Sequence, residues 1–144
     1  MGRVFETNRL VRHGHTDPAG IVFYPRYFEM INEVVEDFFR EALGRPFGDW
    51  HRRKKTGVPT VHIETSFFAP SYCDDVLTFS LKISRLGHSS ATFQIAGRCD
   101  DEQRLTTALT LAHVDLTEMK AIAFGDELRT DLSAFLIDES KESS

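Results

Sequence analysis

The sequence has little of what marks a secreted, membrane-spanning or disulfide-bonded protein. It contains only two cysteines, Cys73 and Cys99, which are too few for a disulfide framework and lack the spacing of a metal site, so free thiols are expected. No apolar run approaches the roughly 20 residues that a transmembrane helix needs, and the N-terminal segment lacks the apolar core of a signal peptide. These absences predict a cytoplasmic protein that does not interact with a membrane.

Positive charge is also scarce. The 144 residues contain 17 Lys and Arg against 22 Asp and Glu, which gives a net charge of -5 at pH 7. That sign is unfavourable for a protein that would bind nucleic acid by neutralising its phosphates, so nucleic-acid binding is not expected. One basic cluster occupies residues 51–55, and such a run is typical of a solvated helix end or loop. The length fits a single domain spanning residues 1–144.

Hydrophobic periodicity predicts one long helix followed by several strands. Apolar residues recur at the i, i+3, i+4 spacing over 27–43, and Pro25 and Gly44 suit the two ends of a helix. A polar segment follows at 45–57. Strands are expected at 3–13, 61–69, 76–86, 90–99, 104–116 and near 119–124, with a short helix around 126–136 and a frayed polar end at 139–144. Short connections favour antiparallel neighbours, so the predicted fold class is α+β.

The apolar positions of the long helix cover more than half of its circumference, so the helix needs cover on more than one side. A single antiparallel sheet curved around this helix would supply it. The other face of such a sheet would stay open, and the adjacent residues Phe67 and Phe68 point to opposite faces of their strand. A homo-oligomer is therefore expected.

Asp17 begins the sequence Asp-Pro-Ala-Gly, which fits a type I turn position by position. On that evidence alone Asp17 has a structural role. However, the start of the helix that follows offers no Ser, Thr, Asn or Asp side chain to cap its free N–H groups. An uncapped helix N-terminus beside a carboxylate could polarise a carbonyl group and stabilise an oxyanion. These residues therefore leave a structural and a catalytic role open for Asp17.

A metal site is an alternative reading of the same region. His13, His15 and Asp17 alternate along the chain, so they would share one face if the first strand continued this far. Two imidazoles and a carboxylate could hold a divalent metal. Outside the basic cluster the remaining histidines, His62, His88 and His113, are isolated in the sequence, and no phosphate-binding Gly-rich loop or hydrolase serine motif is present.

The segment TDPAGIVFYPRYFEM, residues 16–30, resembles the signature of hotdog-fold acyl-CoA thioesterases, specifically the 4-hydroxybenzoyl-CoA thioesterase family. Segments 57–59 and 70–76 are similar to the corresponding segments of that family, and the likeness covers most of residues 5–120. The resemblance implies a hotdog fold, in which an antiparallel β-sheet wraps around one long central helix. It also implies hydrolysis of an acyl-CoA thioester without a metal or other cofactor, in a homodimer or homotetramer with its active site at the subunit interface.

The resemblance also assigns roles to individual residues. Asp17 corresponds to the catalytic carboxylate, acting as nucleophile or general base, and the backbone N–H of Tyr24 to the group that polarises the thioester carbonyl. Asn32 stands where members specific for 4-hydroxybenzoyl groups carry an acid, and Arg85 and His88 lie in the segment that meets coenzyme A phosphates in some members. The acyl group stays open. A non-catalytic acyl-CoA binding protein on the same fold and a metal-dependent enzyme remain as alternatives.

Overall fold

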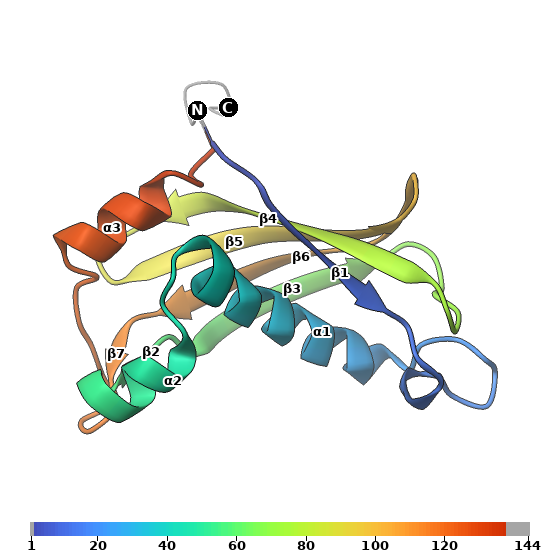
Figure 1. Ribbon diagram of the computed structural model, residues 1–144, viewed down its shortest axis with the longest axis horizontal. Helices are drawn as coiled ribbons and strands as arrows, with labels where there is room; N and C mark the ends of the chain where they lie inside the picture. The colour runs from blue at the N-terminus through green and yellow to red at the C-terminus, as the bar shows by residue number, and fades with distance from the viewer. Residues whose placement is uncertain (1, 138–144) are drawn as a thin grey trace.

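Five long strands form the main sheet of the computed structural model, which describes residues 2–137 (Figure 1). The strands are antiparallel and lie in the order β1-β4-β5-β6-β3. Their bounds are Phe5–Leu10 (β1), Thr60–Phe67 (β3), Val76–Leu86 (β4), Ser90–Cys99 (β5) and Glu102–Ala112 (β6). In β4 the alternation predicted from the sequence is present, because the side chains of Leu77, Phe79, Leu81 and Ile83 are fully buried and their neighbours are not.

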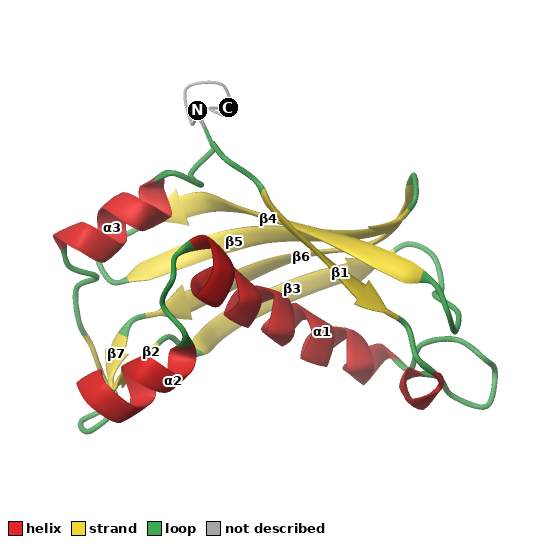
Figure 2. Ribbon diagram, viewed as in Figure 1, coloured by secondary structure: helices red, strands yellow, loops and turns green. Residues whose placement is uncertain are grey.

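One helix, α1 (Tyr24–Asp37), lies across a face of this sheet (Figure 2). It continues directly into a π-helical segment, η2 (Phe38–Ala42). The helix predicted over 27–43 is therefore an α-helix of 14 residues followed by a π-helical turn, and the expectation of one uninterrupted long helix was wrong in that respect. The wider π turn occurs where two adjacent aromatic residues, Phe38 and Phe39, both have fully buried side chains.

A second group of short elements closes one end of the molecule. It consists of α2 (Phe47–Asp49), the π-helical segment η3 (Trp50–Lys54), the three-stranded sheet β2-β7-β8 and α3 (Asp126–Ser133). The bounds of the short strands are Thr56–Gly57 (β2), Val114–Asp115 (β7) and Lys120–Ala121 (β8). The strand predicted over 104–116 is thus interrupted, and the strand predicted near 119–124 is only two residues long. The predicted frayed end at 139–144 lies outside the described residues.

Much of the predicted polar segment 45–57 is helical, because Trp50 anchors it. The Trp50 side chain is buried and lies edge-on to Phe39, with 5.2 Å between ring centroids. The segment therefore contributes to the core instead of forming a loop. Among residues 2–137, no helix is long and apolar enough to cross a membrane.

The core lies between α1 and the sheet, and its centre is aromatic. The ring of Phe38 meets Phe5 from β1, Phe93 from β5 and Phe135, with centroid distances of 5.8, 5.5 and 4.9 Å. Arg9 of β1 also binds the exposed side of α1 through Glu33, at 2.8 Å. These contacts fix the orientation of α1, and with it the position of its N-terminal end.

Candidate active site

The segment between β1 and α1 folds back on itself. The N–H of Asp17 donates to the carbonyl oxygen of Ile21 at 2.9 Å, and Thr16 and Val22 form an antiparallel bridge. The N–H of Gly20 donates to the carbonyl oxygen of Asp17 at 2.8 Å, which closes the predicted four-residue turn. The chain then enters α1 at Tyr24, so only a few residues separate the turn carrying Asp17 from the start of that helix.

The Asp17 carboxylate takes part in this turn and is still partly exposed. Its Oδ1 accepts a hydrogen bond from the N–H of Ala19 at 2.8 Å. Gly20 has a φ of 86°, a left-handed conformation that glycine adopts readily. The turn therefore holds one oxygen of the Asp17 carboxylate, while the residue as a whole remains partly exposed.

The N-terminus of α1 is uncapped, as the sequence predicted. Phe23 occupies the N-cap position and supplies no side-chain hydrogen bond to the helix. Pro25 has no N–H, and the N–H of Arg26 donates to the carbonyl oxygen of Phe23 at 2.8 Å. Of the first three helical residues, this leaves the N–H of Tyr24 as the donor that a ligand oxygen could use, at the positive end of the helix dipole.

A cavity of about 390 Å³ opens beside this end of α1. It is lined by Ile21, Val22, Tyr24, Tyr27, Phe67, Phe68, Ala69 and Pro70. These side chains are largely apolar, and the rings of Tyr27 and Phe67 lie with their centroids 5.3 Å apart. The cavity can therefore hold an apolar or aromatic group beside Tyr24, the first residue of α1.

The structure does not form the metal site that the sequence left open as an alternative. β1 ends at Leu10, and His13–His15 is a 3-10 turn, so His13, His15 and Asp17 do not share a strand face. The Nδ1 atom of His15 instead accepts a hydrogen bond from the backbone N–H of Arg12 at 2.9 Å. Within residues 2–137, no three His, Cys, Asp or Glu side chains are grouped so that they could hold a metal ion.

The other residues singled out in the sequence lie apart from this loop. Asn32 is exposed on α1 and does not line the cavity. Arg85 and His88 are exposed at the far end of β4, whose 11 residues separate them from the Asp17 loop by roughly 30 Å at about 3.3 Å per residue. Arg129 of α3 holds the β4–β5 turn there by donating to the Gly87 carbonyl oxygen at 2.5 Å. A single subunit therefore does not bring Arg85 to Asp17.

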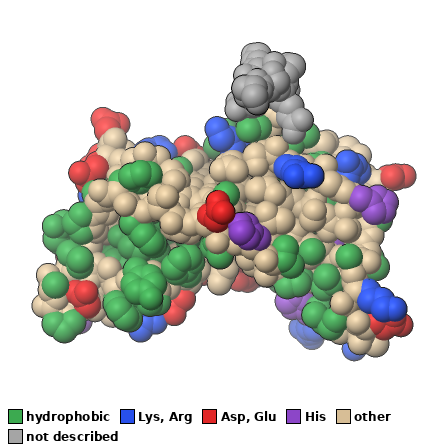
Figure 3. Space-filling model, turned by 180° about the vertical axis from the view of Figure 1, so that it is seen from behind, with side chains coloured by type: hydrophobic (Ala, Val, Ile, Leu, Met, Phe, Trp, Pro, Cys, Tyr) green, Lys and Arg blue, Asp and Glu red, His purple; other side chains and the backbone are tan. Residues whose placement is uncertain are grey.

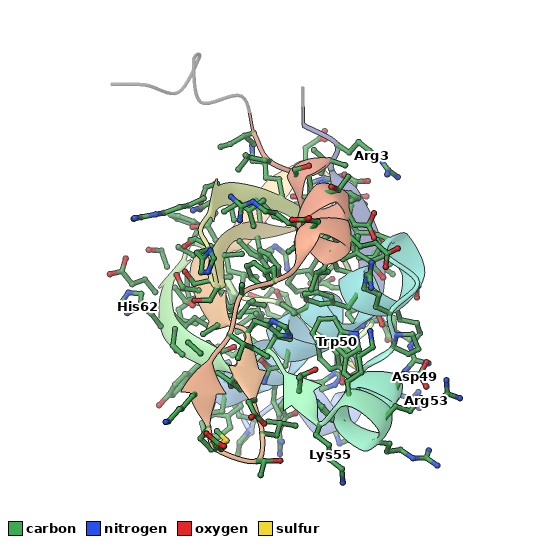
Figure 4. The ribbon with its side chains drawn as sticks, turned by 90° about the vertical axis from the view of Figure 1, so that its left-hand side faces the viewer. Arg3, Asp49, Trp50, Arg53, Lys55 and His62 are labelled. Carbon is green, nitrogen blue, oxygen red and sulfur yellow. The ribbon has the colours of Figure 1, made fainter. Side chains whose placement is uncertain are left out.

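The basic cluster at 51–55 also lies away from the Asp17 loop. Figure 4 shows Trp50 pointing into the molecule, while Arg53 and Lys55 project outward from the helical end. His51, Arg52, Arg53, Lys54 and Lys55 are all exposed. The predicted role of this cluster as a solvated helix end agrees with these positions.

Two buried polar residues that the sequence did not predict, Ser71 and Arg104, lie beneath the loop. Both are buried, and the hydroxyl of Ser71 accepts a hydrogen bond from the Tyr27 hydroxyl at 3.0 Å. Ser71 belongs to segment 70–76, which the sequence marks only through its resemblance to the thioesterase family. Arg104 carries no local signal, since an arginine near the start of a strand is usually exposed.

Comparison with known proteins agrees with this architecture. Residues 19–106 match the model of the thioesterase superfamily. A 1,4-dihydroxy-2-naphthoyl-CoA hydrolase from Acaryochloris marina is 29% identical over 108 residues, which cover 74% of this chain and 77% of that protein.

Solved structures of thioesterases have the same fold. A 1,4-dihydroxy-2-naphthoyl-CoA thioesterase from Synechocystis superposes with a TM-score of 0.83 at 20% identity, over 91% of this chain and 96% of its own. A gentisyl-coenzyme A thioesterase superposes with a TM-score of 0.77 at 25% identity, over 88% and 99% of the two chains. The family match spans more than half of this chain, and the chain therefore belongs to the thioesterase superfamily and has its hotdog fold.

Proposed function

We propose that this protein hydrolyses acyl-CoA thioesters, with Asp17 as the catalytic carboxylate and the Tyr24 N–H as the oxyanion donor. The observations that support the proposal are the hydrogen-bonded turn that presents Asp17 and the uncapped start of α1, which follows it within a few residues. A thioester carbonyl is already electrophilic, so a carboxylate and one oriented N–H form a sufficient minimal set. The reaction needs no metal in this scheme.

Two routes use the same groups. As a general base, Asp17 takes a proton from water, and the resulting hydroxide adds to the thioester carbon. As a nucleophile, the Asp17 carboxylate adds to that carbon itself, and water later hydrolyses the mixed anhydride. In both routes the Tyr24 N–H binds the carbonyl oxygen as it gains negative charge, and the C–S bond breaks to release the coenzyme A thiolate, which then takes a proton.

We further propose that the acyl group is aromatic. The cavity beside Tyr24 is lined by apolar groups and the rings of Tyr27, Phe67 and Phe68, which favour a planar apolar ligand. The relatives above are named for 1,4-dihydroxy-2-naphthoyl-CoA and gentisyl-coenzyme A. We therefore take 1,4-dihydroxy-2-naphthoyl-CoA as the first candidate and 4-hydroxybenzoyl-CoA as the second. For the second, Asn32 would have to contact the acyl group from outside this cavity.

A second copy of the chain is proposed to complete the site. Val61, Phe67 and Phe68, on and beside the edge strand β3, are 60%, 45% and 58% exposed. Figure 3 shows hydrophobic side chains gathered on the left-hand side of the molecule as seen from behind. Burying them in a homodimer or homotetramer would remove apolar surface from water. It would also let Arg85 or His88 of one subunit reach coenzyme A phosphates while Asp17 of the other acts on the thioester.

Thiol release from a panel of aromatic and fatty acyl-CoAs, measured with and without a chelator, tests the proposal. We expect fastest release from aromatic substrates and no effect of the chelator. Binding without release would favour a non-catalytic acyl-CoA binding protein, and loss of activity on chelation would favour a metal-dependent enzyme. Full activity of a monomer at nanomolar concentration would contradict the shared site.

A further inference from the structure

Arg104 is one of few polar residues that the fold buries. Its side chain is only 9% exposed, although it lies near the start of β6. Burying a charge is costly unless the charge is paired and hydrogen-bonded, and a well-packed apolar side chain often stabilises a protein as much or more. Stability alone therefore explains poorly why an arginine occupies this position.

The contacts of Arg104 converge on one segment, residues 70–75. Its Nη1 donates to the carbonyl oxygen of Pro70 at 3.0 Å, to Oγ of Ser71 at 3.1 Å and to Oδ2 of Asp75 at 2.8 Å. Its Nε donates to Oε1 of Glu102 at 2.7 Å. The guanidinium thus holds the two ends of a short segment that has no regular secondary structure for most of its length.

The same segment carries both anchors of the Asp17 loop. The N–H of Val11, where the loop begins, donates to the carbonyl oxygen of Asp75 at 2.8 Å. The N–H of Val22, where the loop ends, donates to the carbonyl oxygen of Ser71 at 2.9 Å. Arg104 therefore binds the side chains of the two residues whose carbonyl oxygens hold the loop at its two ends.

The helix side of the site is tied to the same cluster. The Tyr27 hydroxyl donates to Oγ of Ser71 at 3.0 Å, and Tyr27 lies almost one turn of α1 after Tyr24. Ser71 consequently contacts the loop that carries Asp17 and the helix that carries the Tyr24 N–H.

We infer that Arg104 is a positioning residue, which acts through Ser71 and Asp75 to fix the Asp17 carboxylate relative to the Tyr24 N–H. The inference rests on the proposed thioesterase function. Residues between Val11 and Val22 contribute no buried side chain, so hydrogen bonds must provide the order that packing does not. A displacement of about 1 Å between reacting groups can cost about 10²-fold in rate.

Substitution of Arg104 by methionine tests the inference, because methionine keeps much of the side-chain volume. Arg45→Met is the matched control: Arg45 is 17% exposed and forms a comparable ion pair with Asp131, at 2.7 Å, at the other end of the molecule. We expect Arg104→Met to lower kcat about 10²-fold while KM changes by less than about threefold, since substrate contacts remain. Arg45→Met should keep kcat within about twofold of the wild type, because distant sites act independently. Equal kcat losses in the two folded variants would overturn the inference.

A smaller change keeps the test valid if Arg104→Met does not fold. Ser71→Ala removes the hydroxyl that joins Arg104 to Tyr27, and we expect kcat to fall about tenfold with KM nearly unchanged. The double variant Ser71→Ala/Tyr27→Phe should lower kcat by less than the product of the two single effects. The reason is that each substitution removes the same hydrogen bond, between the Tyr27 and Ser71 hydroxyls. An active wild type with unaffected Ser71→Ala turnover would overturn this inference alone, whereas a wild type that hydrolyses no acyl-CoA would overturn the proposed function.

Discussion

Replacing Asp17 by asparagine separates the chemistry of this residue from its role in the turn. Asparagine is nearly the same size and retains an oxygen that can accept a hydrogen bond from the Ala19 N–H. In the wild type, Oδ1 of Asp17 accepts this bond at 2.8 Å. The backbone hydrogen bond between Gly20 and residue 17 does not involve the side chain. The turn should therefore survive, and the free energy of unfolding should change by no more than about 0.5 kcal/mol.

The effect on turnover should be much larger. An amide can neither accept a proton from water nor attack the thioester as a carboxylate does. Loss of a general base costs about 10² to 10⁴ in rate, and the lower limit corresponds to about 2.7 kcal/mol in the activation barrier. We therefore expect kcat to fall at least about 10²-fold with KM within about threefold, because the cavity and the coenzyme contacts remain.

A matched aspartate at the other end of the molecule provides the control. Oδ1 of Asp115 accepts the N–H of Thr117 at 2.9 Å, which repeats the local hydrogen bond that Asp17 makes with Ala19. Asp115→Asn should leave thiol release unchanged, and both variants should unfold at nearly the wild-type temperature. An Asp17→Asn variant with turnover within about threefold of the wild type would show that Asp17 is only a turn residue, since general-base loss costs far more.

A single turnover in heavy-oxygen water then distinguishes the general-base route from the nucleophilic route. Label retained on Asp17 would identify a covalent intermediate in which the carboxylate is the nucleophile.

Three further variants test the ion pair, the coenzyme site and the sheet. Hydrogen bonds from Arg104 and a backbone N–H lower the pKa of Asp75 below its ordinary 3.8. The resulting stability is present above that value and is lost as pH falls through the folded-state pKa. Lowering the pH below about 4 should therefore reduce the free energy of unfolding of the wild type more than that of Asp75→Asn, as measured by denaturation at each pH. Arg85→Ala should raise KM more than it lowers kcat, and added salt should weaken wild-type binding more than that of the variant. Gly97→Ala would place a methyl group 2.8 Å from Cδ2 of Leu105, and urea denaturation should show a loss of about 1–3 kcal/mol.

Periodicity alone predicted the elements whose apolar residues repeat over several turns or strand pairs. The alternation in β4 and the broad apolar face of α1 are of this kind. The helical segment around Trp50 was missed because only Phe47 and Trp50 mark its buried side among glycine and charged residues. The π turn was missed because it depends on fitting two adjacent rings into one core, which a repeat of 3.6 residues does not describe.

Some residues of the site could be predicted because they are close together in the sequence, whereas others could not because they are far apart. Asp17 and the Tyr24 N–H lie within eight positions of one another, so turn chemistry and the absence of a cap are visible in one continuous stretch. Arg104 is 33 positions from Ser71 and 29 from Asp75. A single sequence does not show which distant residues are in contact. It also does not show whether an isolated arginine is buried or exposed to solvent.

The dependence of the Asp17 loop on distant residues should affect turnover in the proposed enzyme. A loop without buried side chains can move at little cost in packing, and local opening of such segments requires less free energy than unfolding of the core. Its order must come from hydrogen bonds, and those at its two ends join Val11 and Val22 to the segment held by Arg104. Substitutions that leave the 16–30 motif intact can therefore still lower turnover, and those that disturb this buried cluster should do so most.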